Sequence, residues 1–268
     1  MMAYLRALRA IIWREMLRFL HQRERFVSAL VRPLVWLFIF AAGFRAALGI
    51  SVQPPYDTYI TYEIYVLPGL AAMVLLFNGM QSSLSMVYDR EMGSMRLLLT
   101  SPLPREFLLL AKLLAGAVVG LVQVAAFLAI AALAGLTAPA PGYLTVIPAL
   151  LLAGLMLGAV GMLLSSTIRQ LENFAGVMNF VIFPAFFLSS ALYPLWKMRE
   201  GSEWLYQLAR CNPFTHAVEL IRFALYGRLE PAAAAWVAGA TLVFLLLSFW
   251  AYNPARGLMP RKAGAGEG

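Results

Sequence analysis

The sequence of 268 residues is poor in charge, cysteine and histidine, and each shortage excludes a class of protein. Charged residues make up 13% of it and hydrophobic residues 62%, whereas a soluble domain carries about 25% charged residues. One aqueous core cannot bury so much apolar surface, so the lipid bilayer is predicted to be the solvent. The single cysteine, Cys211, excludes an intrachain disulfide, and the two histidines, His21 and His216, lack the spacing of metal ligands.

Residues for enzymatic chemistry are also missing. No Gly-x-x-x-x-Gly-Lys-Ser/Thr phosphate loop occurs, so the chain cannot hydrolyse ATP by itself. No set of nucleophile, base and acid stands out, and we expect no enzymatic site, metal or cofactor on this chain. The interiors of the apolar segments contain no acidic residue, which argues against proton-coupled transport, because such transporters place ionisable groups inside the membrane.

What the sequence does contain is a series of long segments with little or no charge. A helix needs about 20 apolar residues to cross the hydrocarbon layer. One uncharged stretch is longer than a single span, and Pro139, Pro141 and Gly142 divide it into two helices. We predict one all-α integral membrane domain over residues 1–268, with six transmembrane helices at 28–48, 64–86, 113–136, 144–167, 173–190 and 232–252.

The arginines and lysines predict the orientation of this multi-pass protein. If the N-terminus is cytoplasmic, 15 of them fall on the cytoplasmic side and 6 on the other side. Basic residues are enriched in cytoplasmic loops, so we expect both termini inside. The basic residues behind the net charge of +8 cluster at the ends of the predicted spans, where they set the orientation. We therefore expect no nucleic acid partner.

Residues 1–27 are predicted to form an amphipathic helix that lies in the inner headgroup layer. Leu8, Ile12 and Phe19 fall on one face of a helical wheel, with arginines opposite and Glu15 interrupting the apolar face. The alternative is a positively charged tail that only sets the topology.

Residues 87–112 form a polar stretch between two uncharged segments and are predicted to be a cytoplasmic loop. Gly93 permits a sharp bend, Ser94 is placed to cap a short helix, and Pro102 ends it. Such a helix, apolar on one side and charged on the other, is suited to dock a soluble partner; an ordinary solvated connector is the alternative. The residues expected to make the contact are Asp89, Arg90, Glu91, Gly93, Ser94, Met95, Leu98, Leu99 and Pro102.

Residues 191–231, between the last two predicted spans, are too apolar for a free outer loop. Trp196 and Trp204 suit the headgroup level, where tryptophan concentrates. The apolar run that follows His216 predicts a short re-entrant helix, which the membrane tolerates where protein or water covers its backbone. Glu219 and Arg222 lie three residues apart and are predicted to pair on one helix face.

Three sequence blocks resemble the ABC type-2 transporter permease family. DREMGSMRLLLTSPL, residues 89–103, is similar to the family's acidic–Arg–Glu–x–Gly–Thr pattern with its leucines and Thr/Ser–Pro, although Ser94 replaces the threonine. FPAFFLSSALYP, residues 183–194, is similar to a segment ending in Leu–Ser–Gly–x–x–x–Pro, with Ser190 in place of the glycine. NPFTH, residues 212–216, and the downstream Arg222 are similar to a third block.

The resemblance runs in the family's order over nearly the whole chain. It implies the permease subunit of an ATP-binding cassette exporter in a bacterial cytoplasmic membrane, working as a homodimer with a separate ATPase that binds ATP and magnesium. Residues 89–103 would form the coupling helix. The implied exit gate, after the fifth span, contains Ser189, Ser190, Pro194, Asn212, Pro213, His216, Glu219 and Arg222.

The layout is most similar to exporters of polysaccharides, lipo-oligosaccharides and drugs, and the residues themselves do not distinguish these cargoes. Two alternatives to an exporter subunit stay open at the level of the sequence. One is a secondary transporter or channel that works without ATP. The other is a membrane-embedded enzyme or an assembly scaffold.

Overall fold

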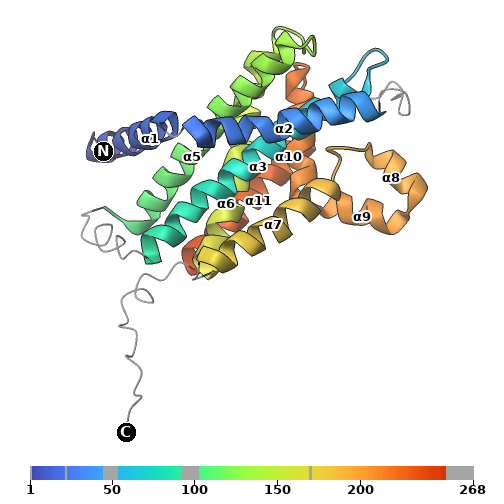
Figure 1. Cartoon of the computed structure of the whole chain (residues 1–268). Helices are drawn as coiled ribbons and strands as arrows, with labels where there is room; N and C mark the ends of the chain where they lie inside the picture. The colour runs from blue at the N-terminus through green and yellow to red at the C-terminus, as the bar shows by residue number, and fades with distance from the viewer. Residues whose placement is uncertain (1, 22, 45–53, 92–102, 169–170, 252–268) are drawn as a thin grey trace.

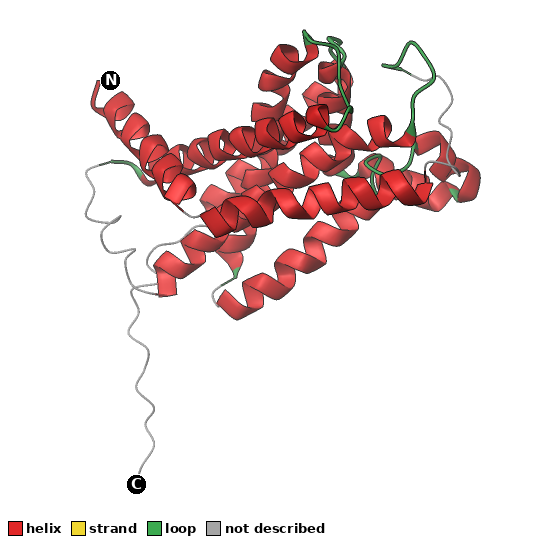
Figure 2. Ribbon diagram, turned by 45° about the horizontal axis from the view of Figure 1, so that its top comes forward, coloured by secondary structure: helices red, strands yellow, loops and turns green. Residues whose placement is uncertain are grey.

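The computed structural model describes residues 2–21, 23–44, 54–91, 103–168 and 171–251, and this part of the chain contains helices and no strand (Figures 1 and 2). The predicted all-α class is therefore confirmed. The helices are α1 Met2–His21, α2 Arg23–Phe44, α3 Tyr62–Glu91, α5 Arg105–Leu133, α6 Gly142–Thr167, α7 Leu171–Phe187, α8 Leu195–Gly201, α9 Glu203–Cys211, α10 Pro213–Leu225 and α11 Pro231–Ala251.

Four described helices are long and apolar enough to cross a membrane. They lie in α3, α5, α6 and α11, at four of the six predicted spans. Helices α2 and α7 occupy the other two positions, but their apolar stretches, Ala29–Ile39 and Gly176–Phe187, are shorter. Both are below the 20 or so residues that a perpendicular crossing of the hydrocarbon requires.

Helix α3 lies at the centre of the bundle and packs against α2, α5, α6, α7 and α10 (Figure 1). In an apolar stretch of 18 residues within Tyr62–Leu84, 94% of the residues are buried against protein; in the corresponding stretch of α11 the share is 22%. Both helices are apolar along their length, and a helix that is apolar all round needs an apolar environment on every side. For α3 the neighbouring helices supply it, whereas most of α11 is left to the membrane or a partner.

Glycine and asparagine set the turns at one end of the bundle. Gly135, with φ of +87°, ends the turn after α5, and Gly227, with φ of +67°, follows α10; other residues rarely adopt this left-handed conformation. Helix α10 begins after Asn212, whose Oδ1 accepts a hydrogen bond from the Phe214 amide at 3.0 Å. Pro213 occupies the first helical position, where its missing N–H costs no hydrogen bond.

Three predicted boundaries differ from the structure. Helix α3 continues to Glu91 and α5 begins at Arg105, so the connection expected at 87–112 is shorter and Asp89–Glu91 form the last turn of α3. Residues 87–92 contain no proline or glycine, and charge alone does not end a helix. The stretch 1–27 is divided between α1 and α2, and 191–231 contains the three helices α8, α9 and α10.

Two parts of the chain project from the bundle on opposite sides, α1 on the left and α8 with α9 on the right in Figure 1. Helix α1 packs against α5 and α2, and Tyr4 meets Phe107 edge to face with ring centroids 5.0 Å apart. Along its predicted apolar face, Leu5 is exposed and Phe19 is buried. Both ends of α1 therefore contact the bundle, through Tyr4 near its start and Phe19 near its end.

Candidate functional site

The most highly charged buried site surrounds Arg222 of α10, which is only 2% exposed. Its Nη1 donates to Glu219 Oε1, so the ion pair predicted from the i, i+3 spacing is confirmed. Its Nη2 donates to the carbonyl oxygen of Ser190 at 2.8 Å. The guanidinium also lies 4.1 Å from the centre of the Tyr65 ring, a distance at which a cation is attracted to the ring face.

Two tyrosines of α3 bind the segment that follows α7. The Tyr65 hydroxyl donates to the Ser190 carbonyl and the Tyr62 hydroxyl to the Leu192 carbonyl, each at 2.9 Å. A Cβ built at Gly69 would lie 2.7 Å from the backbone of Ala191, so this segment lies directly on α3. We call Tyr62, Tyr65, Ser190, Glu219 and Arg222 the Arg222 cluster; it joins α3, α10 and the α7–α8 connection.

The start of α10 is tied to its neighbours by the residues of the third sequence block. Asn212 Nδ2 donates to the carbonyls of Ala185 and Leu188, at 2.8 and 2.7 Å. The imidazole of His216 lies parallel to the indole of Trp236 on α11, with 4.8 Å between the centroids. Its Nε2 lies 3.0 Å from the Arg210 carbonyl, so this nitrogen carries the proton that is donated.

Burial shifts the protonation equilibria around this end of the bundle. It raises the pKa values of Tyr56 and Tyr226 above the ordinary range for tyrosine, because the charged phenolate is disfavoured away from water. Burial likewise lowers the pKa of His216, against the opposing effects of the Arg210 carbonyl and the Glu219 carboxylate. The neutral forms of these three side chains are therefore favoured.

The structure brings most of the predicted exit-gate residues to this region. Ser189, Ser190, Asn212 and Arg222 take part in the contacts of the α7–α8 connection and α10. Pro194 directly precedes α8 and Pro213 is the first residue of α10. Their role in gating stays a prediction. Among the described residues, no group of three histidine, cysteine, aspartate or glutamate side chains gathers to hold a metal ion.

The predicted docking residues lie largely outside the described part of the chain. The structure places the backbone of Asp89, Arg90 and Glu91 at the end of α3. Their side chains, and the residues Gly93, Ser94, Met95, Leu98, Leu99 and Pro102, lie outside the described residues. The connection joins α3 to α5, two helices that pack against each other.

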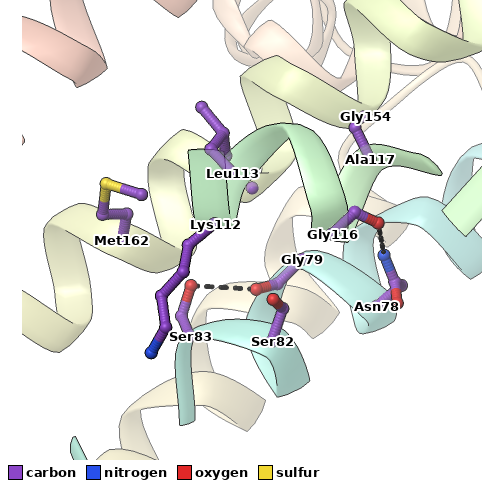
Figure 3. A pocket seen from close by; sticks show the side chains of 11 residues that line it. Asn78, Gly79, Ser82, Ser83, Lys112, Leu113, Gly116, Ala117, Gly154 and Met162 are labelled. Atoms are coloured by element: carbon purple, nitrogen blue, oxygen red, sulfur yellow. Dashed lines mark hydrogen bonds between the residues drawn. The ribbon is translucent and has the colours of Figure 1, made fainter. Parts of the chain in front are cut away.

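A second polar site lies where α3, α5 and α6 cross (Figure 3). Asn78 Nδ2 donates to the Gly116 carbonyl at 2.7 Å, and Ser83 Oγ donates to the Gly79 carbonyl at 3.0 Å. A cavity of about 20 Å³ lies between the helices. Its lining consists of Asn78, Gly79, Ser82 and Ser83 of α3, Lys112, Leu113, Gly116 and Ala117 of α5, and Gly154, Gly158 and Met162 of α6. We call this set the Asn78 cluster.

Glycines let the backbones of the Asn78 cluster come close together. A Cβ built at Gly79 would lie 2.9 Å from the backbone nitrogen of Gly158, and one at Gly120 would lie 2.8 Å from Asn78 Nδ2. Small residues at helix crossings in membranes favour this close approach. The glycine pairs 116/120 and 154/158 of the sequence thus serve packing within this chain.

Several residues of both clusters do not stand out in the sequence. Tyr62 and Tyr65 hydrogen-bond to carbonyls 130 and 125 residues away, which no local pattern indicates. Glu15 and Arg18 of α1 line a further cavity of about 30 Å³ together with Phe19, Asn78, Ser82, Gly116 and Val119. The one local signal was the position of Glu15, which interrupts the apolar face of α1 because that face meets polar groups there.

Comparison with known proteins identifies the class to which this bundle belongs. Residues 6–226 match the model of the ABC-2 type transporter family, so the chain belongs to that family and is a membrane transport permease.

Individual relatives agree with this family. A protein named as a transport permease, ycf38 of Cyanophora paradoxa, is 27% identical over 87% of this chain and 76% of its own length. The protein of the same name from Porphyra purpurea is 26% identical over 80% of this chain and 72% of its own. YbhR of Escherichia coli K12, named as a multidrug ABC transporter permease, is 31% identical over 62% of this chain and 45% of its own.

Proposed function

We propose that this chain is the permease subunit of an ATP-driven exporter and that a separate ATPase docks on residues 89–103. The observation that carries the proposal is the family match over residues 6–226, which includes this segment. The segment joins α3 to α5, so force applied to it reaches the most buried helix of the bundle directly. ATP and magnesium belong to the partner, because this sequence lacks a phosphate loop.

The proposed arrangement in the bacterial cytoplasmic membrane has six spans with both termini inside. Helices α2 and α7 complete the set of six, their short apolar stretches being extended by tilt, local thinning of the bilayer or a partner subunit. In this arrangement α1 lies on the inner surface, and α8, α9 and α10 form the re-entrant outer segment that gates the exit. The basic bias of the cytoplasmic segments supports this orientation.

A homodimer supplies the surface that the single chain leaves uncovered. Helices α2, α7 and α11 expose large apolar side chains, among them Phe38, Phe180 and Trp250. A path between two copies that includes such side chains suits an amphipathic cargo, such as a glycolipid, a polysaccharide or a drug. The multidrug name of the Escherichia coli relative is in keeping with the last of these.

The competing function is a secondary transporter or channel that works without ATP. The two are separated by purifying the chain with the ATPase encoded beside it and measuring ATP hydrolysis in lipid nanodiscs, with and without candidate cargo. An exporter retains the ATPase through purification, and its cargo stimulates hydrolysis. Transport driven by an ion gradient in vesicles, with no retained ATPase, would contradict the proposal.

Within this experiment, Leu98→Asp tests the docking segment. Buried apolar anchors dominate protein interfaces and rim charges contribute less, so this change should abolish retention of the ATPase while Arg90→Ala weakens it modestly. A charge placed in a dry pocket costs several kcal/mol, on the order of 2–7 for an uncompensated polar group. Retention of the ATPase by Leu98→Asp at the affinity of the unchanged chain would refute the assignment of the coupling helix.

A further inference from the structure

Two small polar cavities meet at the side chain of Asn78. The first is the cavity of about 20 Å³ in the Asn78 cluster, and the second is the cavity of about 30 Å³ that α1 closes with Glu15 and Arg18. Both are lined by Asn78, Ser82 and Gly116. The side chains that they share therefore lie between α1 on one side and α6 on the other.

Asn78 has hydrogen-bonding capacity directed at these cavities that the protein does not use. Its residue is 7% exposed, and Nδ2 donates to the Gly116 carbonyl at 2.7 Å. Oδ1 accepts no hydrogen bond from the described residues. This oxygen is not fully enclosed by protein, so a water in the cavity can reach it and donate a hydrogen bond to it.

The volume and the polar lining of each cavity match the requirements for a single water molecule. A cavity of about 10–15 Å³ or more holds a single water if two to four polar groups surround it. Asn78, Ser82, Ser83 and Lys112 line the first cavity, and Glu15, Arg18, Asn78 and Ser82 line the second. Neither volume accommodates a phosphate or lipid headgroup, which is larger than a water.

We propose that each cavity binds an ordered water and that the two waters, on either side of Asn78 and Ser82, join α1 to the crossing of α3, α5 and α6. Water bridges of this kind are nearly as favourable in enthalpy as direct hydrogen bonds and are easily exchanged. They hold α1 in register with α3 and α5.

A mechanical consequence follows if the proposed coupling segment is correct. Helix α3 ends and α5 begins at that segment, and the waters connect both helices to α1. Movement imposed at residues 92–104 then reaches α1 through the hydrated contact as well as through the packing of α1 on α5. This consequence rests on the proposed function, whereas the water sites themselves do not.

Radiolytic hydroxyl-radical labelling of the full chain in nanodiscs tests the water sites, because radicals form from bound water and attack adjacent side chains. Met162 lines the first cavity and Phe19 the second. Met156 and Phe127 are also buried, at 0% exposed against 3% for Met162 and 4% for Phe19; they line neither cavity and serve as controls of the same residue type. We expect Met162 to be labelled several-fold faster than Met156, and Phe19 several-fold faster than Phe127.

Two substitutions make the test specific to each cavity. Gly154 lines the first cavity alone, and a Cβ there meets Ala117 at an ordinary 3.5 Å, so Gly154→Ala should slow labelling of Met162 and leave Phe19 unchanged. Gly116 lines both, and a Cβ there would lie 3.0 Å from the Ser82 hydroxyl, so Gly116→Ala should slow labelling at both positions. Gly239→Ala, with open space around the added methyl, is the neutral control.

Three labelling outcomes would overturn the proposal. Labelling of Met162 and Phe19 at the rates of their controls overturns the proposal, and so does fast labelling that neither substitution slows, because bulk water then supplies the radicals. Fast labelling at only one of the two positions overturns the paired arrangement. The measurement needs no ATPase, so its failure leaves the exporter function standing, and loss of ATPase binding leaves the water sites standing.

Discussion

The Arg222 cluster and the Asn78 cluster join the same helix, α3, to its neighbours in opposite ways. Between Tyr65 and Ser82 the helix rises by roughly 25 Å at 1.5 Å per residue. At the first site a buried cation, a carboxylate and two tyrosine hydroxyls fasten α3 to α10 and to the α7–α8 connection. At the second site glycines let the backbones of the helices approach closely, and two small cavities lie beside them.

Because of this difference, the two ends of α3 should be sensitive to different kinds of substitution. A network of charges and hydroxyls depends on every partner, since a buried group left alone is costly. A crossing of glycines depends instead on the space between the helices, since added volume must displace backbone. Removing a partner should therefore damage the Arg222 end most, and adding a methyl group should damage the Asn78 end most.

The largest effect is expected for Arg222→Met, which keeps the length of the side chain and removes its charge. Glu219 then lies partly buried without its cation, and the Ser190 carbonyl loses a donor. Breaking a buried ion pair in this way costs about 3–5 kcal/mol. Thermal unfolding in detergent measures it, with Arg199→Met as the control because that arginine pairs with Glu203 at the surface, where ion pairs contribute about 0–1 kcal/mol.

The double substitution Arg222→Met with Glu219→Leu sharpens this result. It removes the stranded carboxylate together with its partner, so part of the lost stability should return. If the single and double variants are equally unstable, the damage comes from packing around residue 222 and the ion pair is not what holds α10 to α3.

The next effect in size is expected for Gly79→Ala, which adds one methyl group at the glycine crossing. The new Cβ would lie 2.9 Å from the backbone nitrogen of Gly158, so α3 and α6 must separate. Overpacking of this kind costs about 1–3 kcal/mol. The control is Gly176→Ala on α7, where no atom lies within 4 Å of the added methyl; equal melting temperatures for the two variants would contradict a tight crossing.

These two clusters also show what the sequence could and could not predict. The positions of the long helices and the Glu219–Arg222 pair follow from charge gaps and i, i+3 spacing, which are local features. The tyrosine contacts link residues more than a hundred positions apart, and their existence depends on how α7 and α10 fold back on α3. The extension of α3 through Asp89–Glu91 into the predicted cytoplasmic segment does not follow from charge, because charged residues occur in both helices and loops.

A smaller loss of stability is expected for Tyr65→Phe, which removes the tyrosine's hydrogen bond at the Arg222 end and keeps its contact with the guanidinium. The ring stays beneath the guanidinium, 4.1 Å from it, while the hydrogen bond to the Ser190 carbonyl is lost. A single hydrogen bond contributes about 0.5–1.5 kcal/mol, so the loss of stability should fall in that range. Tyr59→Phe, at an exposed tyrosine, should change nothing measurable. A loss as large as that of Arg222→Met would mean that the hydroxyl, and not the cation, organises the cluster.

The smallest effect is a pH dependence at the Arg222 end. Burial lowers the pKa of folded His216 below its usual 6.5, so as the pH falls the unfolded chain binds a proton first and unfolding becomes easier. His216→Phe keeps a ring to stack on Trp236 and removes the titration. Between pH 7 and pH 5, the melting temperature of the unchanged chain should therefore fall more than that of the variant. Parallel pH profiles would show that the pKa of His216 is the same in the folded and unfolded chains, and the comparison between the two ends of α3 would then rest on Arg222 and the tyrosines.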